Sequence, residues 1–208
     1  MARFKNGILG AFFGTVGTVV GYELNGDAIM RSKPGKKRGK PTKLELANRA
    51  WFKELQLWLK PIKVFLRVGF KNYDPKFQGF VAAKSYNKDA SIGTYPNVKV
   101  DPAKVLVSYG TIEPLQEAQI EVDDNNVVSF KWTFVSYKST DKVMILLYDV
   151  AAGKAIMDVS AASVFAGKYD WDLSGSKLTG EFQAYIAVVN MVDETQSNSV
   201  YLGAVTLQ

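Results

Sequence analysis

Apolar and polar side chains alternate through Val128-Ser-Phe-Lys-Trp-Thr-Phe134. Successive side chains of a β-strand point to opposite faces of a sheet, so this alternation predicts a strand with one buried and one solvated face. Trp132 lies on the apolar side of the pattern, and we expect its indole in a hydrophobic core.

Similar short runs, rich in β-branched and aromatic residues, follow one another through the second half of the chain. They are Val105–Tyr109, Ile120–Val122, Val143–Tyr148, Ala155–Val159, Val164–Trp171, Phe182–Asn190 and Val200–Leu207. Turn residues such as Asp123-Asp-Asn-Asn126 separate them. Seven or eight strands over residues 97–208 predict an antiparallel β-sandwich of immunoglobulin or fibronectin type, and the lack of cysteine favours the fibronectin-like variant.

A helix is predicted immediately after Pro41. Thr42-Lys-Leu-Glu45 has the form of a capping box, in which the two side chains satisfy backbone N–H groups of the first turn. Apolar residues then recur every three or four positions, which places them on one helical face. They are Leu44, Ala47, Trp51, Leu55 and Trp58. Pro61 ends or kinks this helix.

Two further helical segments are predicted before the strands begin. Apolar residues at helical spacing indicate one that ends near Gly69 and another that ends before Gly93. We therefore expect an α+β fold with three parts. A glycine-rich arm, hairpin and basic strap occupy residues 1–41, a helical region occupies 42–96, and the sandwich occupies 97–208.

The beginning of the chain is an apolar segment interrupted by glycines at spacings of 3, 4, 3 and 4. A free helix is not expected, because each glycine costs about 1 kcal/mol relative to alanine. Such an apolar segment needs a cover, which is either the chain's own helices or another copy of the protein. A nucleotide-binding loop is not expected, since the Lys-Ser/Thr of a P-loop is missing. We call these residues the assembly arm: Gly7, Ile8, Leu9, Gly10, Phe12, Phe13, Gly14, Val16, Gly17, Val19, Val20 and Gly21.

A β-hairpin is predicted where the arm ends. Asn25-Gly26 is the dipeptide that best suits a two-residue type I′ turn. Val19–Leu24 and Asp27–Ser32 flank it and supply the two strands.

A basic strap connects this hairpin to the first helix. Between residues 31 and 43 it carries seven basic residues and no acidic one: Arg31, Lys33, Lys36, Lys37, Arg38, Lys40 and Lys43. Three interpretations are open: a solvated connector, a segment that docks on the acidic surface of a neighbouring subunit, or a nucleic-acid contact. A segment that binds single-stranded nucleic acid also needs aromatic residues between its basic ones, and the strap has none. Trp51, Phe52 and Trp58 follow on the helix, where we expect them in the core.

Charge is distributed unevenly along the chain. Residues 1–100 contain 19 basic and 6 acidic residues, whereas residues 101–208 contain 7 basic and 14 acidic residues. The basic half can meet nucleic acid, or it can meet the acidic half of another copy in a head-to-tail contact.

The composition excludes most common catalytic systems. The chain has neither histidine nor cysteine, so imidazole bases, thiolate nucleophiles and their metal sites are excluded. Acidic pairs at Asp123-Asp124, Asp170-x-Asp172 and Asp193-Glu194 fall at predicted turns, where aspartate is ordinary turn chemistry. We therefore assign no catalytic, cofactor-binding or metal residues, and we expect no cofactor and no enzyme.

Tyrosines of the strand region have two interpretations. They could form a platform on which a sugar stacks, but we favour ordinary sheet positions. These residues are Tyr109, Tyr137, Tyr148, Tyr185 and Tyr201.

The N-terminus gives little information about location. It superficially resembles a signal peptide, but its glycines make a poor apolar segment and no cleavage site follows. No stretch approaches about 20 uninterrupted apolar residues, so a membrane span is not expected.

Four stretches stand out along the chain: Asn6-Gly-Ile-Leu-Gly10, Val16-Gly-Thr-Val-Val-Gly21, Val105-Leu-Val-Ser-Tyr-Gly110 and Ser197-Asn-Ser-x-Tyr-Leu-Gly203. With them the chain resembles an uncharacterised domain-of-unknown-function family that is abundant in Bacteroidota. The resemblance spans nearly the whole chain and implies an architecture, but no catalytic residues. A shorter stretch, Pro41-Thr-x-x-Glu-x-x-x-Arg-x-x-Phe52, is similar to helix starts in phage head and tail proteins.

The leading hypothesis is a non-enzymatic structural protein that self-assembles through its N-terminal arm and its charge-complementary halves. A filament, a tube or a virion-like shell is compatible with it, in an extracellular assembly or a virion. Its expected partners are copies of itself in head-to-tail contact, which we favour over a closed symmetric oligomer. One alternative is a binding module whose sandwich takes a glycan or a protein. Another is a nucleic-acid-binding protein that uses residues 31–71.

Overall fold

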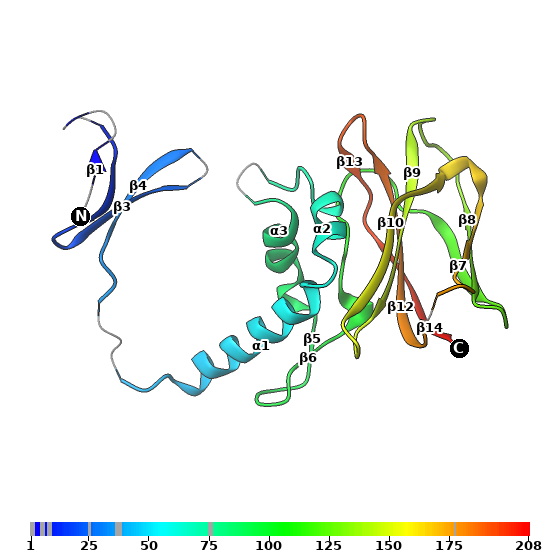
Figure 1. The fold of residues 1–208 in the computed structure, drawn as a ribbon, viewed down its shortest axis with the longest axis horizontal. Coiled ribbons are helices and arrows are strands. Elements are labelled where there is room, and N and C mark those ends of the chain that lie inside the picture. The colour runs from blue at the N-terminus through cyan, green and yellow to red at the C-terminus, as the bar shows by residue number, and fades with distance from the viewer. Residues whose placement is uncertain are drawn as a thin grey trace. The chain divides into compact units, whose positions relative to one another are not determined.

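The computed structural model describes the chain except for residues 1, 2, 5, 6, 8, 9, 25, 36–38, 75, 76 and 177. The chain forms two compact units, residues 1–42 and residues 43–208. The helical region and the sandwich thus belong to the same unit. The predicted α+β class is confirmed, since helices and antiparallel sheets are both present (Figure 1).

The N-terminal unit is an antiparallel sheet of four strands in the order β1-β2-β3-β4. We call it the N-terminal sheet; its strands are β1 (Arg3–Phe4), β2 (Phe12–Val16), β3 (Val19–Leu24) and β4 (Asp27–Ser32). The predicted hairpin is confirmed, because Leu24 pairs with Asp27 across a two-residue turn. Asn25, the first residue of that turn, lies outside the described residues. The glycine series therefore forms strands and turns.

The helices begin the second unit. α1 (Lys43–Leu59) starts directly after Thr42 and ends before Pro61, and α2 (Lys63–Gly69) and α3 (Gly79–Tyr86) follow. All three predicted helices are confirmed. One core assignment on α1 is wrong, because Phe52 is 47% exposed. Leu44, at the start of the predicted apolar face, is also exposed. The core contacts of α1 begin only at Trp51, and Phe52 faces away from them beneath the Lys84 ammonium group.

Two sheets form the sandwich. The smaller sheet has the order β11-β8-β7, with β7 (Gln116–Val122), β8 (Val127–Thr133) and β11 (Lys168–Asp172). The larger sheet has the order β10-β9-β12, and both β13 and β14 pair with β12. Its strands are β9 (Asp141–Asp149), β10 (Lys154–Ser163), β12 (Gly180–Asn190), β13 (Thr195–Gln196) and β14 (Val200–Leu207). The two antiparallel sheets give a sandwich-like arrangement.

Short elements complete the second unit. They are the 3-10 turns η1 (Asn87–Asp89), η2 (Pro102–Lys104) and η3 (Val164–Ala166) and the paired strands β5 (Ser91–Ile92) and β6 (Lys99–Val100).

One predicted strand is wrong, and another is wrong in part. Val105–Tyr109 is not a strand, because its backbone N–H groups bond to the Asn87 and Ser199 side chains and to the Gly69 carbonyl. Val164–Trp171 is divided between η3 and β11. Gly167 separates them with a φ of 66°, a left-handed conformation that favours glycine.

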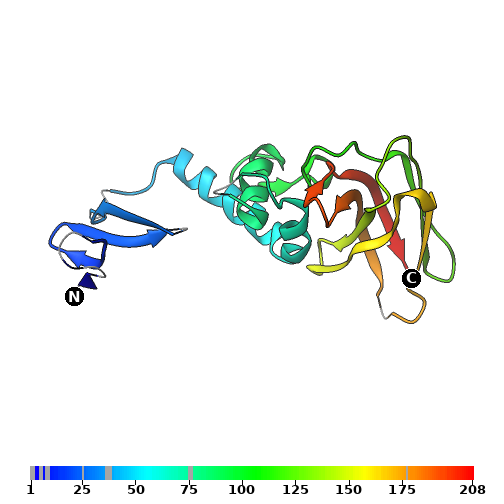
Figure 2. The same cartoon turned by 90° about the horizontal axis from the view of Figure 1, so that it is seen from above.

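The second unit has three layers, with the larger sheet in the middle. Alternate residues of β9 and β12, such as Leu146 and Ala187, pack with the helices. The residues between them, such as Ile145 and Ile186, pack against the smaller sheet and Trp132, as predicted for that indole. Figure 1 and the view from above in Figure 2 show helices on one side of the sheet and β7–β8 on the other. Both faces of β9 and β12 are thus buried, which explains their nearly continuous apolar sequences.

Candidate assembly surfaces

The N-terminal sheet has almost no interior. Of its residues whose side chains the structure describes, Gly21 alone is buried. Cross-strand pairing places Val20 opposite Thr15 and Tyr22 opposite Ile29, so these residues share one face of the sheet. Strand alternation adds two more apolar residues to this face, which we call the N-terminal apolar face: Phe13, Val20, Tyr22, Leu24 and Ile29. None of the five side chains is buried.

The opposite face of the N-terminal sheet also carries accessible apolar groups. Met30 is 69% exposed, and Val16 is exposed as well. Phe12 lies on this side, where its ring covers Gly21. A sheet of this kind buries little apolar surface by itself, so both of its faces are available to a partner.

Most of the predicted assembly arm lies in the β2–β3 hairpin. Its members from Phe12 to Gly21 are brought together there, whereas Ile8 and Leu9 lie outside the described residues. Sequence reasoning missed Leu24 and Ile29 on the N-terminal apolar face and Met30 on the opposite face. The signal that could have found them is the Asn-Gly dipeptide, because it predicts that the strand after it pairs with β3, as β4 does.

The basic strap continues from β4 to α1. The Lys33 backbone N–H donates to the Thr18 carbonyl at 2.7 Å, and the Arg31 guanidinium lies 5.4 Å from the centre of the Tyr22 ring. Every described residue from 31 to 43 is exposed, and Lys36, Lys37 and Arg38 lie outside the described residues. The described strap residues are therefore accessible to a partner.

A second exposed apolar surface lies at one end of the sandwich. The β8–β9 loop, η3 and the β12–β13 turn all lie at this end, which is at the top of the sandwich in Figure 1. Val135 is 75% exposed and Val192 is 74% exposed. The Phe134 and Phe165 rings meet edge to face with their centres 5.3 Å apart. We call this surface the loop-end patch: Phe134, Val135, Phe165, Met191 and Val192.

Polar contacts hold two of these loops in place. The buried Asn190 amide donates to the Thr140 hydroxyl at 2.9 Å and to the Asp141 carboxylate at 2.7 Å. Its oxygen accepts from the backbone N–H groups of Val192 and Asp193. Lys138 forms an ion pair with Asp193, and this hydrogen bond raises the pKa of Lys138. The exposed valines therefore sit on loops that are already ordered.

Acidic pairs serve local structure. The Asp123 carboxylate accepts from the Asn125 and Val127 backbone N–H groups, as expected for a turn. Asp170 pairs with Lys168, and this contact lowers the pKa of Asp170. No group of three acidic residues in the described part of the chain could hold a metal ion.

The tyrosines do not form a common sugar platform. Tyr148 and Tyr185 are buried within the larger sheet, as the interpretation as sheet residues predicted. Tyr109 lies outside the strands and packs against Tyr73 and Tyr86.

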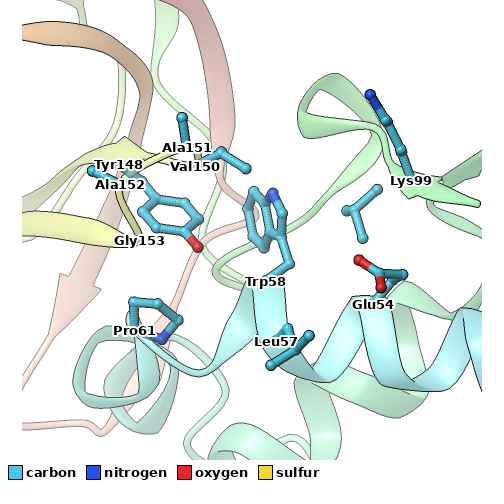
Figure 3. A pocket seen from close by; sticks show the side chains of 11 residues that line it. Glu54, Leu57, Trp58, Pro61, Lys99, Tyr148, Val150, Ala151, Ala152 and Gly153 are labelled. Atoms are coloured by element: carbon cyan, nitrogen blue, oxygen red, sulfur yellow. The ribbon is translucent and has the colours of Figure 1, made fainter.

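One pocket of about 490 Å³ lies between α1, β6 and the β9–β10 turn (Figure 3). The Trp58 and Tyr148 rings meet edge to face in it with their centres 4.9 Å apart. Burial raises the pKa of Tyr148 to about 12, with a further contribution from Asp149, so its hydroxyl stays protonated near neutral pH. Glu54 and Lys99 also line the pocket. A ligand that has both an apolar part and a hydrogen-bond acceptor would suit this lining, because the lining combines aromatic rings with hydrogen-bond donors.

Two stretches that carry the family resemblance meet beside the larger sheet. The buried Ser108 hydroxyl donates to the Ser197 carbonyl at 2.7 Å, and the Ser108 carbonyl accepts from the Ser199 N–H at 3.0 Å. Ser199 in turn accepts from the Val107 N–H at 3.0 Å. These contacts join the segment after η2 to the connection between β13 and β14.

Comparison with known proteins identifies a family that covers most of the chain. Residues 11–203 match a family of unknown function, DUF6266. No curated protein matches the chain. No helix in the described part of the chain is long and apolar enough to cross a membrane. The match includes β2–β4 of the N-terminal sheet, the helices and most of the sandwich, and the chain therefore belongs to the DUF6266 family.

Proposed function

We propose that this protein is a non-enzymatic structural subunit that self-assembles, with the N-terminal sheet of one copy covered by another copy. The observation that carries the proposal is the exposure of the apolar residues of the N-terminal sheet. Its apolar residues lie on both faces, and Gly21 alone is buried among its residues with described side chains.

The free energy of exposed apolar surface favours packing of another protein layer on this sheet. Apolar surface that stays in water costs roughly 25 cal/mol for each Å² that burial would remove. A sheet without a packed layer on at least one face is also marginal by itself. A second copy can supply that layer, whereas the second unit already has its own two hydrophobic clusters.

Charge favours contact between unlike halves of two copies. Residues 1–42 contain 8 basic and 2 acidic residues, whereas residues 101–208 contain 7 basic and 14 acidic residues. A contact between two different surfaces of the same protein is heterologous. When the rotation that relates neighbouring copies does not close a small ring, such contacts continue into a filament, a tube or a shell. The likeness of residues 41–52 to phage helix starts supports the virion-like form, and an extracellular filament is the other form.

Sedimentation velocity on the full chain and on residues 43–208 tests the proposal. The shorter chain keeps both hydrophobic clusters of the second unit, so we expect it to fold and to remain a monomer. We expect the full chain to form large species whose share rises with protein concentration. A shorter chain that assembles as well as the full chain would contradict the role of the N-terminal sheet. A full chain that stays monomeric would favour the binding module instead.

A further inference from the structure

We infer that the loop-end patch receives the N-terminal sheet of a second copy. This inference rests on the proposed function and assigns the acceptor surface for it. The patch consists of Phe134, Val135, Phe165, Met191 and Val192, as defined above.

Apolar exposure in the acidic half is concentrated at this patch. Among the described residues from 101 to 208, six large apolar side chains are exposed, and five of them belong to the patch. The sixth, Val150, lies in the β9–β10 turn at the other end of the sandwich. A cluster of this kind on an otherwise polar surface is typical of an interaction site.

The loops that carry the loop-end patch are held by hydrogen bonds, which favours binding of a partner there. Asn190 joins the β8–β9 loop to the end of β12 through Thr140 and Asp141, and the Lys138–Asp193 ion pair adds a second link. A surface that is already ordered loses little conformational entropy when a partner binds.

The distribution of charge favours the N-terminal sheet as the segment that binds the loop-end patch. The exposed apolar side chains of the helices, such as Leu57, Val64 and Val81, lie in residues 43–100, which contain 11 basic and 4 acidic residues. The basic N-terminal unit is repelled by that segment and attracted by the acidic half. The N-terminal apolar face offers complementary chemistry, because Tyr22, Leu24 and Ile29 can meet the valines of the patch.

The test is a full-length chain with Val135→Asp and Val192→Asp. Both side chains are largely in solvent, so we expect an unchanged melting temperature. Two buried carboxylates would weaken the proposed contact, and we expect a loss of at least about tenfold in association measured by sedimentation velocity. The matched control is Val64→Asp, at an exposed site on α2 outside the patch, which should assemble like the wild type.

A mixing experiment separates a lost acceptor from a damaged chain. The full-length double variant keeps its N-terminal sheet, and residues 43–208 of the wild type keep the patch. We expect these two chains to form a complex, and we expect none when the shorter chain also carries the two aspartates. If the double variant assembles as well as the wild type, this inference is wrong, but the proposed function still stands. A wild-type chain that stays monomeric would overturn the proposed function together with it.

Discussion

The ring of Phe12 lies against the backbone of Gly21 in the N-terminal sheet. A Cβ atom at position 21 would come within 2.8 Å of that ring, which is closer than real Cβ contacts allow. Glycine is therefore required here so that β2 and β3 approach and the aromatic ring covers the gap. This contact gives a means to disturb the N-terminal sheet without changing the second unit.

Gly21→Val should abolish assembly, because the new side chain collides with Phe12 and breaks the β2–β3 pairing. The melting temperature of the second unit should be unchanged, since residue 21 belongs to the other unit. Electron microscopy and thermal unfolding measured on the same sample check both results.

Gly35→Val is the matched control for this substitution. No atom lies within 4 Å of the place where its Cβ would be, and residue 35 is in the exposed strap. Normal assembly of Gly21→Val would show that the N-terminal sheet is not needed for the contact.

Ser108→Ala should destabilise the second unit by about 1–3 kcal/mol, because it leaves the buried Ser197 carbonyl without its hydrogen bond. Ser108 is fully buried, whereas Ser160 in β10 is exposed and provides the control as Ser160→Ala. Urea unfolding of both variants checks the prediction. Equal free energies of unfolding for the two variants would mean that the Ser108 hydrogen bond does not stabilise the second unit.

Alkaline pH should weaken the second unit through Tyr148. Its pKa is raised to about 12 in the folded chain by burial and by Asp149, whereas an unfolded tyrosine titrates near pH ~10. Between these values the unfolded chain releases a proton that the folded chain keeps, so the free energy of unfolding falls as pH rises. Burial raises the pKa of Tyr185 in the same direction.

Urea unfolding from about pH 9 to about pH 11.5 measures this slope. Tyr148→Phe should reduce it, because the substituted side chain has no proton to lose. The same slope in the variant and the wild type would contradict the assignment to Tyr148.

Local signals account for the parts of the fold that could be predicted from the sequence. The Asn25-Gly26 dipeptide in the sequence predicted the β3–β4 hairpin, and the alternation around Phe130 and Trp132 predicted β8. In contrast, Val105–Tyr109 has the composition of a strand but forms none. Its hydrogen-bond partners, including Ser199, are remote in sequence and no local pattern reveals them.

Of the two candidate surfaces, only one could be predicted from the sequence. Glycine and apolar composition indicated the N-terminal surface directly. The loop-end patch was missed, because each loop supplies only one or two apolar residues, such as Val135 and Val192. Only the strand order of the sandwich brings those loops to one end of the molecule.

Negative-stain electron microscopy of the purified full chain, at low salt and at about 0.5 M salt, tests self-assembly most directly. Salt at that concentration screens charges beyond a few ångströms. The account predicts regular filaments, tubes or shells at low salt and their loss at high salt. Single small particles under both conditions would contradict it.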